Sequence, residues 1–481
     1  MTDATFDLVI RHARCVTAAD TFDADIGIID GRIVALGAQL AAGREEIDAE
    51  GRYVLPGGVD GHCHLDQPMN DGSVMADDFL SGTRSAACGG TTTVIPFACQ
   101  MKGHSLREAV DDYHRRAGDK ACIDYAFHLI VSDPTPEVLN EELPALIREG
   151  YTSFKIYMTY DDLKLGDREI LDVLSVARAE GAMVMMHAEN SDCIAWLTER
   201  LLAAGKTAPA YHAASRPMLV EREATHRAIA LAELVDVPIL IVHVSGREAV
   251  AQIQWAQAQG LQVYAETCPQ YLFLTAADLG LDEHTHHHPG AKCICSPPPR
   301  DAANQQVIWD GLQSGSFAVF SSDHAPFRFD DPQGKFVAGE DAAFNQIPNG
   351  IPGLETRLAL LFSAGVLGGR LDIHDFVALT STNVAKMYGL YPRKGSIAIG
   401  ADADLVIWDT GIARTIRNAD LHHDVDYTPY EGQTVSAWPR TTLSRGKVVA
   451  DSGQFLGKSG HGQFLPCNLP TPARPRVRGT R

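Results

Sequence analysis

The stretch GVDGHCHL, residues 58–65, marks the point at which the rhythm of the sequence changes. Before it come short β-rich runs, such as DLVI (7–10) and IGII (26–29), and an Asp30-Gly31 pair that predicts a hairpin turn. From residue 58 onward, short apolar runs alternate with amphipathic helical stretches. The change predicts a small antiparallel β unit followed by an α/β domain.

The α/β part contains eight apolar runs, at residues 58–65, 92–97, 124–131, 153–158, 182–186, 239–244, 262–265 and 317–321. Eight strands that alternate with helices are typical of a (β/α)8 barrel, the TIM-barrel fold. A doubly wound sheet has a similar alternation, but here no GxGxxG motif opens the first helix. The sequence therefore predicts the α/β barrel class.

The β-rich pattern returns after about residue 395, in ADLVIW (403–408) and in TTLSRGKVV (441–449). We expect the two terminal β segments to pair as one small β-sandwich. The predicted domains are that discontinuous sandwich, the metal-dependent barrel and a C-terminal tail that lies on a surface or on a neighbouring subunit. Their bounds are 1–57 with 395–466 for the sandwich, 58–394 for the barrel, and 467–481 for the tail.

Composition and charge limit the classes of partner. The 481 residues include 61 acidic residues against 41 Lys and Arg, a net charge of −20, which disfavours nucleic acid and anionic membranes. No apolar run reaches the roughly 18 residues that a membrane helix needs. The N-terminus lacks the features of a signal peptide, and the 10 Cys form no CxxC pair. We therefore expect a cytoplasmic protein with free thiols.

Four of the 19 His, together with one Asp, fall at the ends of predicted strands, where barrel enzymes carry their chemistry. His62 and His64 end the first run, and strand alternation points both to the same side. His187, His243 and Asp323 end the fifth, sixth and eighth runs. Any one of them could be a core residue, but the five matching positions together predict a metal centre.

Lys155 lies inside the apolar run SFKIYM (153–158). A charged lysine in such a strand is costly unless it is paired. It either extends its ammonium to the rim or is converted to a carbamate, an anion able to bridge two metal ions. The residue pattern alone leaves both possibilities open.

At this point several motifs become recognisable together. PGGVDGHCHLDQP (56–68) resembles the first-strand signature of the cyclic amidohydrolases, specifically the dihydropyrimidinase and hydantoinase group. The resemblance continues in order along nearly the whole chain, through GYTSFKIYMTY (150–160), MMHAEN (185–190), VHVS (242–245), CSPPPR (295–300), SSDHAPF (321–327) and IPNGIPGLETR (347–357). The family fold, a barrel flanked by a β-sandwich from both termini, matches the rhythm described above.

The resemblance implies a centre of two divalent metal ions, with zinc as the expected metal. His62 and His64 would hold the first ion, with Asp323 as a further ligand. His187 and His243 would hold the second ion. Lys155, as N6-carboxylysine, would bridge the two.

The resemblance also implies an activity, the hydrolytic ring opening of 5,6-dihydropyrimidines and 5-substituted hydantoins to N-carbamoyl amino acids. Tyr160 would stabilise the developing oxyanion, and Asp323 would transfer the proton. Backbone groups of Ser296 and Asn349 would hold the small cyclic amide. Around the ring substituent, the expected lining is Leu65, Met69 and Tyr157.

Several alternatives stay open. Dihydroorotases carry an Arg at the position of Asp66, and an Asp there would repel a substrate carboxylate. An allantoinase or an imidase remains possible, as does a non-catalytic scaffold resembling the collapsin response mediator proteins, although this chain keeps all six ligand positions. Cys63 and Pro96 depart from the residues usual in the family, and alternation directs Cys63 away from the metals into packing.

Other polar residues look less functional. The cluster of His284, His286, His287 and His288 lies in a predicted loop, so we expect a solvated loop there rather than a metal site. His324 could assist from behind the ligands. Asp66, Asp77 and Asp78 are expected to be loop or helix-start acids. From the family resemblance we expect a homotetramer.

Overall fold

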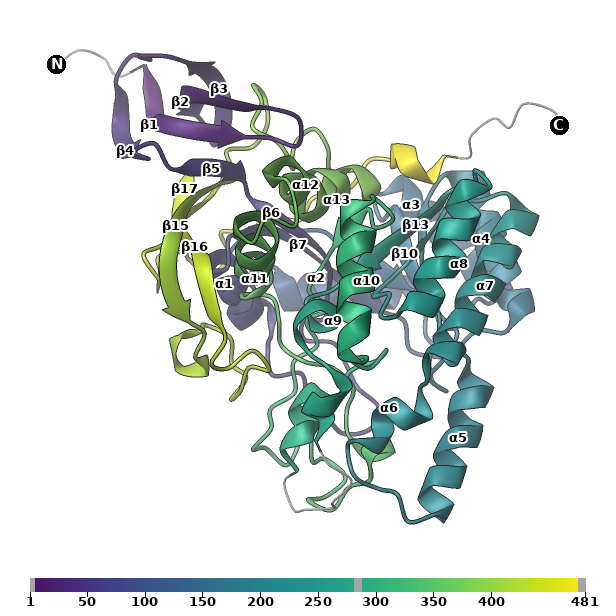
Figure 1. Cartoon of the computed structure of the whole chain (residues 1–481). Coiled ribbons are helices and arrows are strands. Elements are labelled where there is room, and N and C mark those ends of the chain that lie inside the picture. Colours follow the sequence, from purple (N-terminus) through teal and green to yellow (C-terminus); the bar gives the residue numbers. More distant parts are fainter. Residues whose placement is uncertain (1–4, 281–287, 475–481) are drawn as a thin grey trace.

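The computed structural model describes residues 5–280 and 288–474 (Figure 1). Its centre is a parallel sheet whose strands follow the order β6-β7-β9-β10-β11-β12-β13-β14, with β8 paired to β7. The strands are β6 (Gly58–Cys63), β7 (Thr91–Cys99), β8 (Asp124–Tyr125), β9 (His128–Ile130), β10 (Ser153–Tyr157), β11 (Met183–His187), β12 (Ile239–Ile241), β13 (Val263–Thr267) and β14 (Val319–Phe320). Each of the eight predicted runs overlaps one of these strands or, in the third run, two.

Backbone hydrogen bonds join the last strand to the first and close the sheet into a barrel. The Asp323 N–H donates to the His62 carbonyl at 2.9 Å, and the His64 N–H donates to the His324 carbonyl at 2.7 Å. Closure therefore places the residues that follow β14 beside the end of β6. The predicted (β/α)8 barrel is confirmed.

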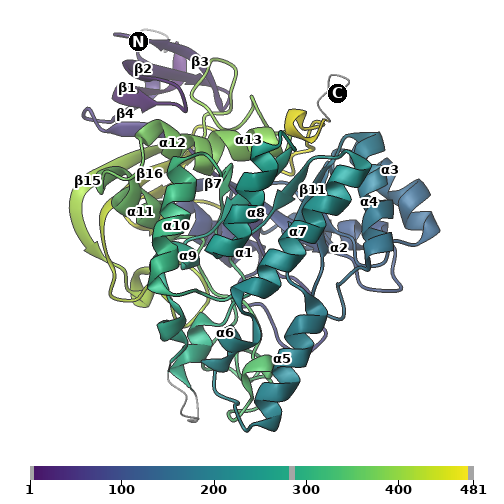
Figure 2. The ribbon, with the colours of Figure 1, turned by 45° about the vertical axis from the view of Figure 1, so that its right-hand side comes forward.

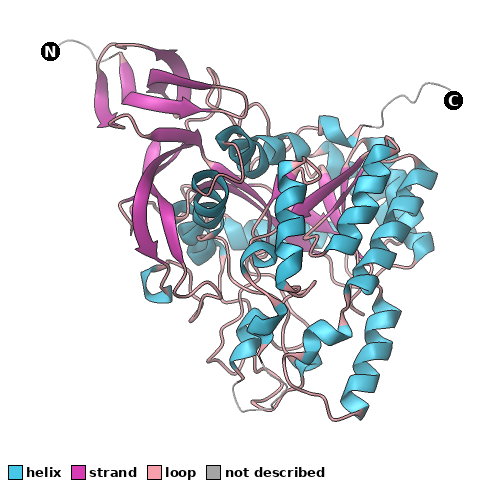
Figure 3. Cartoon of the chain, viewed as in Figure 1, coloured by secondary structure: helices cyan, strands magenta, loops and turns pink. Residues whose placement is uncertain are grey.

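Helices surround the barrel strands (Figures 1 and 3). The α-helices are α1 (Phe79–Cys88), α2 (Leu106–Ala117), α3 (Leu143–Arg148), α4 (Asp167–Glu180), α5 (Ser191–Ala203), α6 (Tyr211–Ser215), α7 (Met218–Val235), α8 (Arg247–Ala258), α9 (Gln270–Phe273), α10 (Ala302–Gln313), α11 (Arg357–Leu361), α12 (Ile373–Val377) and α13 (Asn383–Met387). Local signals start several of them: the Asp78 side chain caps α1 and the Ser105 hydroxyl caps α2. Among the described residues, no helix combines the length and the apolarity that a membrane crossing requires.

Strands from both ends of the chain build a second sheet, in the order β18-β17-β16-β15-β5-β1-β2-β3, with β4 paired to β1. These strands are β1 (Phe6–Val16), β2 (Thr21–Ile29), β3 (Arg32–Gly37), β4 (Gly43–Asp48), β5 (Tyr53–Pro56), β15 (Leu405–Thr415), β16 (Thr434–Ser444), β17 (Lys447–Asp451) and β18 (Gln454–Phe455). Antiparallel pairing of β5 with β15 connects the two ends. The β-rich unit lies beside the barrel in both orientations of the ribbon (Figures 1 and 2).

The described part of the C-terminal tail packs against its own chain. The Cys467 N–H donates to the Gly150 carbonyl at 2.9 Å, and the Asn468 N–H donates to the Gly389 carbonyl at 3.0 Å. Cys467 and Ala473 are buried in the cluster that also fills the barrel interior. Up to residue 474, the tail covers the barrel end opposite to the catalytic face of this fold.

Candidate active site

All six predicted metal ligands lie at or near the C-terminal ends of barrel strands. His62 belongs to β6 and His64 follows it, Lys155 belongs to β10, and His187 ends β11. His243 and Asp323 follow β12 and β14 within three residues. On β10, Phe154 and Ile156 belong to the outer core between strands and helices, so alternation turns Lys155 into the barrel.

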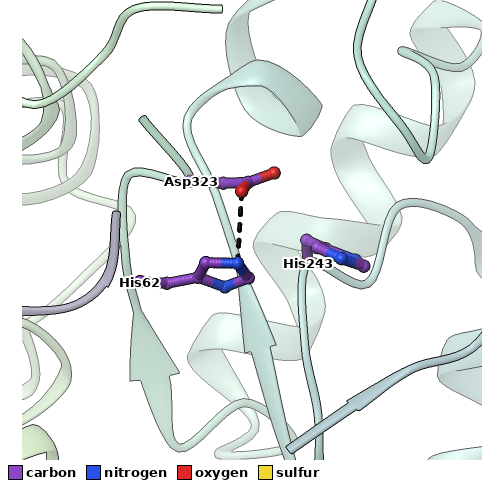
Figure 4. Close-up of side chains that lie close together, drawn as sticks. All are labelled: His62, His243 and Asp323. Carbon is purple, nitrogen blue, oxygen red and sulfur yellow. Dashed lines mark ion pairs between the residues drawn. The ribbon is translucent and has the colours of Figure 1, made fainter. Parts of the chain in front are cut away.

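The donor atoms of these residues converge. Asp323 Oδ1 lies 3.2 Å from His62 Nε2 and 3.5 Å from His64 Nε2, and Lys155 Nζ lies 2.7 Å from His62 Nε2. His243 Nε2 lies 2.8 Å from His187 Nδ1. Donor atoms of His62, His243 and Asp323 all fall within 4.8 Å of one another (Figure 4). Residues predicted for two different ions therefore share one compact, buried cluster.

On three of these histidines, the other ring nitrogen is held from behind by an acceptor. His62 Nδ1 lies 2.6 Å from Glu266 Oε1, and His64 Nδ1 lies 2.7 Å from Gln67 Oε1. His187 Nε2 lies 2.8 Å from Glu189 Oε2. Such an acceptor fixes the ring orientation and leaves the opposite nitrogen unprotonated, which is the arrangement found around metal-binding histidines.

Burial and charge both bias the site towards the protonation states that metal ligands need. Burial lowers the pKa of His62 well below its ordinary value, and it lowers the pKa of Lys155 to about 8. Burial alone would raise the pKa of the Asp323 carboxyl, but the charges of His62, His64 and Lys155 hold it at about 2. The cluster thus favours a neutral imidazole at His62 and an ionised carboxylate at Asp323, and it makes the Lys155 amine easier to deprotonate.

Three residues of the site hold a left-handed backbone. The φ angle is +67° at Tyr160, +40° at His243 and +48° at Asp323. Residues other than glycine rarely adopt this backbone conformation, and where they do so the surrounding structure must stabilise it. At Asp323 the bond from its N–H to His62 supplies part of that support, so barrel closure and side-chain placement are coupled.

A cavity of about 520 Å³ opens over the cluster. Its lining includes the predicted substrate residues Met69, Tyr157, Tyr160, Ser296 and Asn349. The Ser296 hydroxyl donates to Asn349 Oδ1 at 2.9 Å, which ties the two segments together. Further apolar side chains in the lining are Met75, Phe327, Val337 and Ile347.

The predicted place of Leu65 is wrong. We expected it to line the pocket, but it is fully buried in the outer core, where it packs against Gly82 of α1. The reason is strand alternation: when His62 and His64 face inward, Cys63 and Leu65 face outward. The same alternation confirms the expectation that Cys63 packs away from the ligands.

Asp66 is a loop acid as predicted, but the expected repulsion of a substrate carboxylate by its side chain is wrong. Asp66 does not line the cavity, and its carboxylate pairs with Arg116 at 2.8 Å. It therefore does not face a bound substrate. Asp78, in contrast, is a helix-start acid as predicted, because it caps α1.

His324 and Asp77 form a buried pair behind the site, with 3.0 Å between Nε2 and the carboxylate. His324 Nδ1 accepts from the Gly353 N–H at 3.1 Å, so the ring is fully engaged and is not a ligand. In the histidine cluster, residues 284, 286 and 287 lie outside the described residues. The described member, His288, is buried and its Nδ1 accepts from the Gly290 N–H.

Sequence reasoning missed Glu266, Glu189 and Arg216. Glu266 lies on β13, one residue beyond the predicted seventh run, and a buried acid in an apolar strand is the same signal that singled out Lys155. Glu189 accepts from Arg216 at 2.8 Å as well as from His187. The guanidinium of Arg216 also lies 5.6 Å from the ring centre of Tyr160, so it connects Glu189 with a residue that lines the cavity.

The donor set fits divalent metal ions. The convergent atoms are imidazole nitrogens and carboxylate oxygen, which borderline ions such as zinc prefer, and the rings are oriented from behind. The His243 Nδ1 and the second oxygen of Glu266 have no hydrogen-bond partner within the described part of the chain. Buried polar atoms without partners are uncommon outside functional sites.

Comparison with known proteins agrees with this geometry. The family model described as "Amidohydrolase family" matches residues 53–449. The chain belongs to the amidohydrolase family. It is 46% identical to the D-hydantoinase of Geobacillus stearothermophilus, over 95% of this chain and 96% of that protein. It is 43% identical to the D-hydantoinase of Rhizobium radiobacter, over 95% and 98%.

Among solved structures, the dihydropyrimidinase from Brevibacillus agri NCHU1002 superposes with a TM-score of 0.92. The two chains are 43% identical, and the match covers 98% of this chain and 99% of that one. The predicted resemblance to the dihydropyrimidinase and hydantoinase group is therefore confirmed. Members of the family are hydrolases, and the cavity over the convergent donors is the place where this chain would carry that chemistry.

Proposed function

We propose that this chain opens cyclic amide rings by hydrolysis. Its substrates are 5,6-dihydropyrimidines and 5-substituted hydantoins, and its products are N-carbamoyl amino acids. The observation that carries the proposal is the convergence of His62, His64, Lys155, His187, His243 and Asp323 at the base of a cavity lined by Tyr160, Ser296 and Asn349. Relatives that share more than 40% of the sequence are D-hydantoinases by name.

The proposal includes two divalent ions, with zinc as the expected metal. His62, His64 and Asp323 would hold one ion, His187 and His243 the other, and Lys155 would bridge them as N6-carboxylysine. The lowered pKa of Lys155 supports this, because only a neutral amine reacts with carbon dioxide. When bound, two such ions supply Lewis-acid activation of water and of the amide carbonyl.

The residues of the chain supply positioning and proton transfer. The Asp323 carboxylate, held ionised, would accept a proton from the attacking water and deliver it to the ring nitrogen, since an amide nitrogen leaves poorly unless it is protonated. Tyr160 keeps its phenol protonated, because burial raises its pKa, and would donate a hydrogen bond to the developing oxyanion. Ser296 and Asn349 would hold the ring, while Met69 and Tyr157 would contact its substituent.

One panel of substrates tests the proposal: dihydrouracil, 5-phenylhydantoin, allantoin and a cyclic imide, each with the metal-loaded enzyme. We expect turnover of dihydrouracil and phenylhydantoin, with N-carbamoyl products detected by mass spectrometry. Exclusive turnover of allantoin or of the imide would replace the proposal with the corresponding sibling activity. Fewer than one divalent ion per chain after metal-replete purification, together with no ring opening, would favour the scaffold.

We also propose the assembly and location expected from the sequence, a homotetramer in the cytoplasm. The mass of the chain is 52.0 kDa. Gel filtration with light scattering should give about four times that mass. A monomer would contradict the assembly.

A further inference from the structure

Lys335 is a fully buried lysine that lies outside the predicted metal ligands. Its Nζ donates to three backbone carbonyls, those of Ile294 at 3.1 Å, Pro348 at 2.7 Å and Gly350 at 2.6 Å. An ammonium group has three donors and no acceptor, so three carbonyls satisfy it completely. Among the described residues, no carboxylate lies within ion-pair distance of this nitrogen.

The three carbonyls belong to two segments that are distant in sequence and meet at the cavity. Ser296 and Asn349 line the cavity and are joined by their side chains. The Gly350 N–H also donates to the Ile294 carbonyl at 3.0 Å. Lys335 thus lies behind the crossing of segments 294–296 and 348–350 and contacts both.

Its bond to Pro348 also orients a peptide group at the cavity. In a trans peptide the C=O and the N–H point in opposite directions, so tying the Pro348 carbonyl to Lys335 turns the Asn349 N–H away from the lysine. Within the described residues this N–H makes no hydrogen bond to protein. The bond to Gly350 constrains the next peptide but one, so Asn349 is held on both sides.

A buried ammonium without an anion is costly, and an apolar side chain of similar length would fill the same space more cheaply. The cost shows in the pKa of Lys335, which burial lowers to about 7. The ring of Phe327, which also lines the cavity, lies 5.7 Å from the ammonium. The Lys335 ammonium is costly to bury, and its hydrogen bonds go to two segments that line one cavity. This combination indicates a role in that cavity.

We propose that Lys335 is a positioning residue that fixes segments 294–296 and 348–350 for binding the ring of the substrate. The inference rests on the proposed function, in which Ser296 and Asn349 hold the cyclic amide. Within the described part of the chain, Lys335 bonds to no predicted metal ligand and to neither of the residues proposed to contact the ring substituent, Met69 and Tyr157. Its loss therefore weakens binding of the ground state and of the transition state alike, which raises KM and leaves kcat nearly unchanged.

The test compares wild type with Lys335→Met and Lys335→Gln, using dihydrouracil and 5-phenylhydantoin. We expect Lys335→Met to raise KM about tenfold or more for both substrates by a similar factor, with kcat within about threefold. Lys335→Gln keeps two amide donors and should recover part of the loss. Metal content and thermal unfolding are measured for each variant, and Lys394→Met, a buried lysine at the other barrel end, is the matched control with unchanged KM.

An unchanged KM in Lys335→Met, beside an active wild type, would overturn the inference alone. A fall in kcat with loss of metal would also overturn it, because the lysine would then support the metal cluster. If neither variant folded, Lys335 would be a support of the fold and not of the site. A wild type that opens neither ring would remove the proposed function, and this inference with it.

Discussion

Lys155 and Lys394 are both buried in the barrel, at opposite ends of its strands, and their surroundings differ. Lys394 Nζ lies within 3.0 Å of three carboxylates, those of Asp124, Asp402 and Asp404. Among the residues that the structure describes, Lys155 Nζ makes one hydrogen bond, to His62. Burial lowers the pKa of both lysines, but the three carboxylates reverse the shift at Lys394, which ends above its ordinary value.

The difference separates two uses of a buried charge. At the Lys394 end, barrel and β-rich unit meet: Asp124 belongs to β8, Asp404 precedes β15, and Arg445 also donates to Asp124 at 3.0 Å. The network is fully paired and holds the two parts together. At the Lys155 end, neighbouring atoms such as His243 Nδ1 have no protein partner within the described residues. Polar atoms that are buried without partners lower the stability of that end, and this cost is typical of the face on which the fold carries its active sites.

The largest expected effect is at the reactive end. We expect Asp323→Ala to abolish turnover, a loss of roughly 10⁴-fold, because it removes both a proposed ligand and the proton carrier. Steady-state assays on phenylhydantoin measure it. The matched control is Asp161→Ala, which removes an exposed acid at the same cavity. In the described part of the chain Asp161 pairs with Lys164 alone, and the variant should keep kcat within about twofold. Near wild-type kcat in Asp323→Ala would show that the assignment is wrong.

At the Lys394 end of the barrel, the expected effect is on the stability of the fold. Lys394→Met removes the cation that three buried carboxylates share, leaving Arg445 beside Asp124 and Arg393 beside Asp402. We expect the free energy of unfolding to fall by about 3–5 kcal/mol. Urea denaturation measures this, and kcat of the folded fraction should be unchanged. Because the pKa of Lys394 is raised, its contribution is present at neutral pH and is lost only as the pH rises through that raised value. A fall in the free energy of unfolding of under 1 kcal/mol would show that the Lys394 network does not stabilise the fold as proposed.

For Lys155, substitution by methionine should have the opposite effect on the free energy of unfolding. In the metal-free, unmodified protein its pKa of about 8 lies below the ordinary 10.5, so the unfolded chain binds more protons between these pH values. Stability of the wild type should therefore rise with pH in that window. At pH 7, Lys155→Met should be more stable than the metal-free wild type by up to roughly 3 kcal/mol, a gap that closes towards pH 10.5. Denaturation curves at pH 7, 8.5 and 10 measure it, and a constant gap would refute the explanation.

The smallest effect concerns the support behind the cluster. Glu266→Gln weakens the acceptor for His62 Nδ1 while keeping its shape, and we expect the affinity for zinc to fall by about 10- to 100-fold. Titration of the metal-free protein against a competing chelator measures it. Glu108→Gln, an exposed position on α2, is the control. Equal affinities in wild type and Glu266→Gln would mean that His62 is oriented without this carboxylate.

Periodicity was sufficient to predict the barrel and the strand ends on which His62, His187 and His243 lie, because strand alternation and strand order are local properties. The same reasoning was wrong at two positions, Glu266 and Leu65. The seventh predicted run ended at Ala265, one residue before Glu266, and alternation was applied to Cys63 but not to Leu65, which shares its direction. Both errors could have been avoided with the same local rule.

Other features have no local signal. Lys335 stands in the loop sequence QGKF, where a solvated lysine is the ordinary expectation, and only the crossing of two distant segments buries it. Asp66 looks like a pocket residue beside the ligand motif until Arg116 of α2 is placed next to it. The left-handed backbone at His243 and Asp323 likewise depends on the strands around them.

The sequence by itself determined the fold class, the family and the residue types of the centre, because hydrophobic periodicity and short motifs are written along the chain. The tertiary structure alone decided which atoms meet. Closure between β14 and β6 brings Asp323 to His62, and the approach of segments 294–296 and 348–350 creates the place that Lys335 fills. These contacts join residues far apart in sequence, so their distances and pKa shifts exist only in the folded chain.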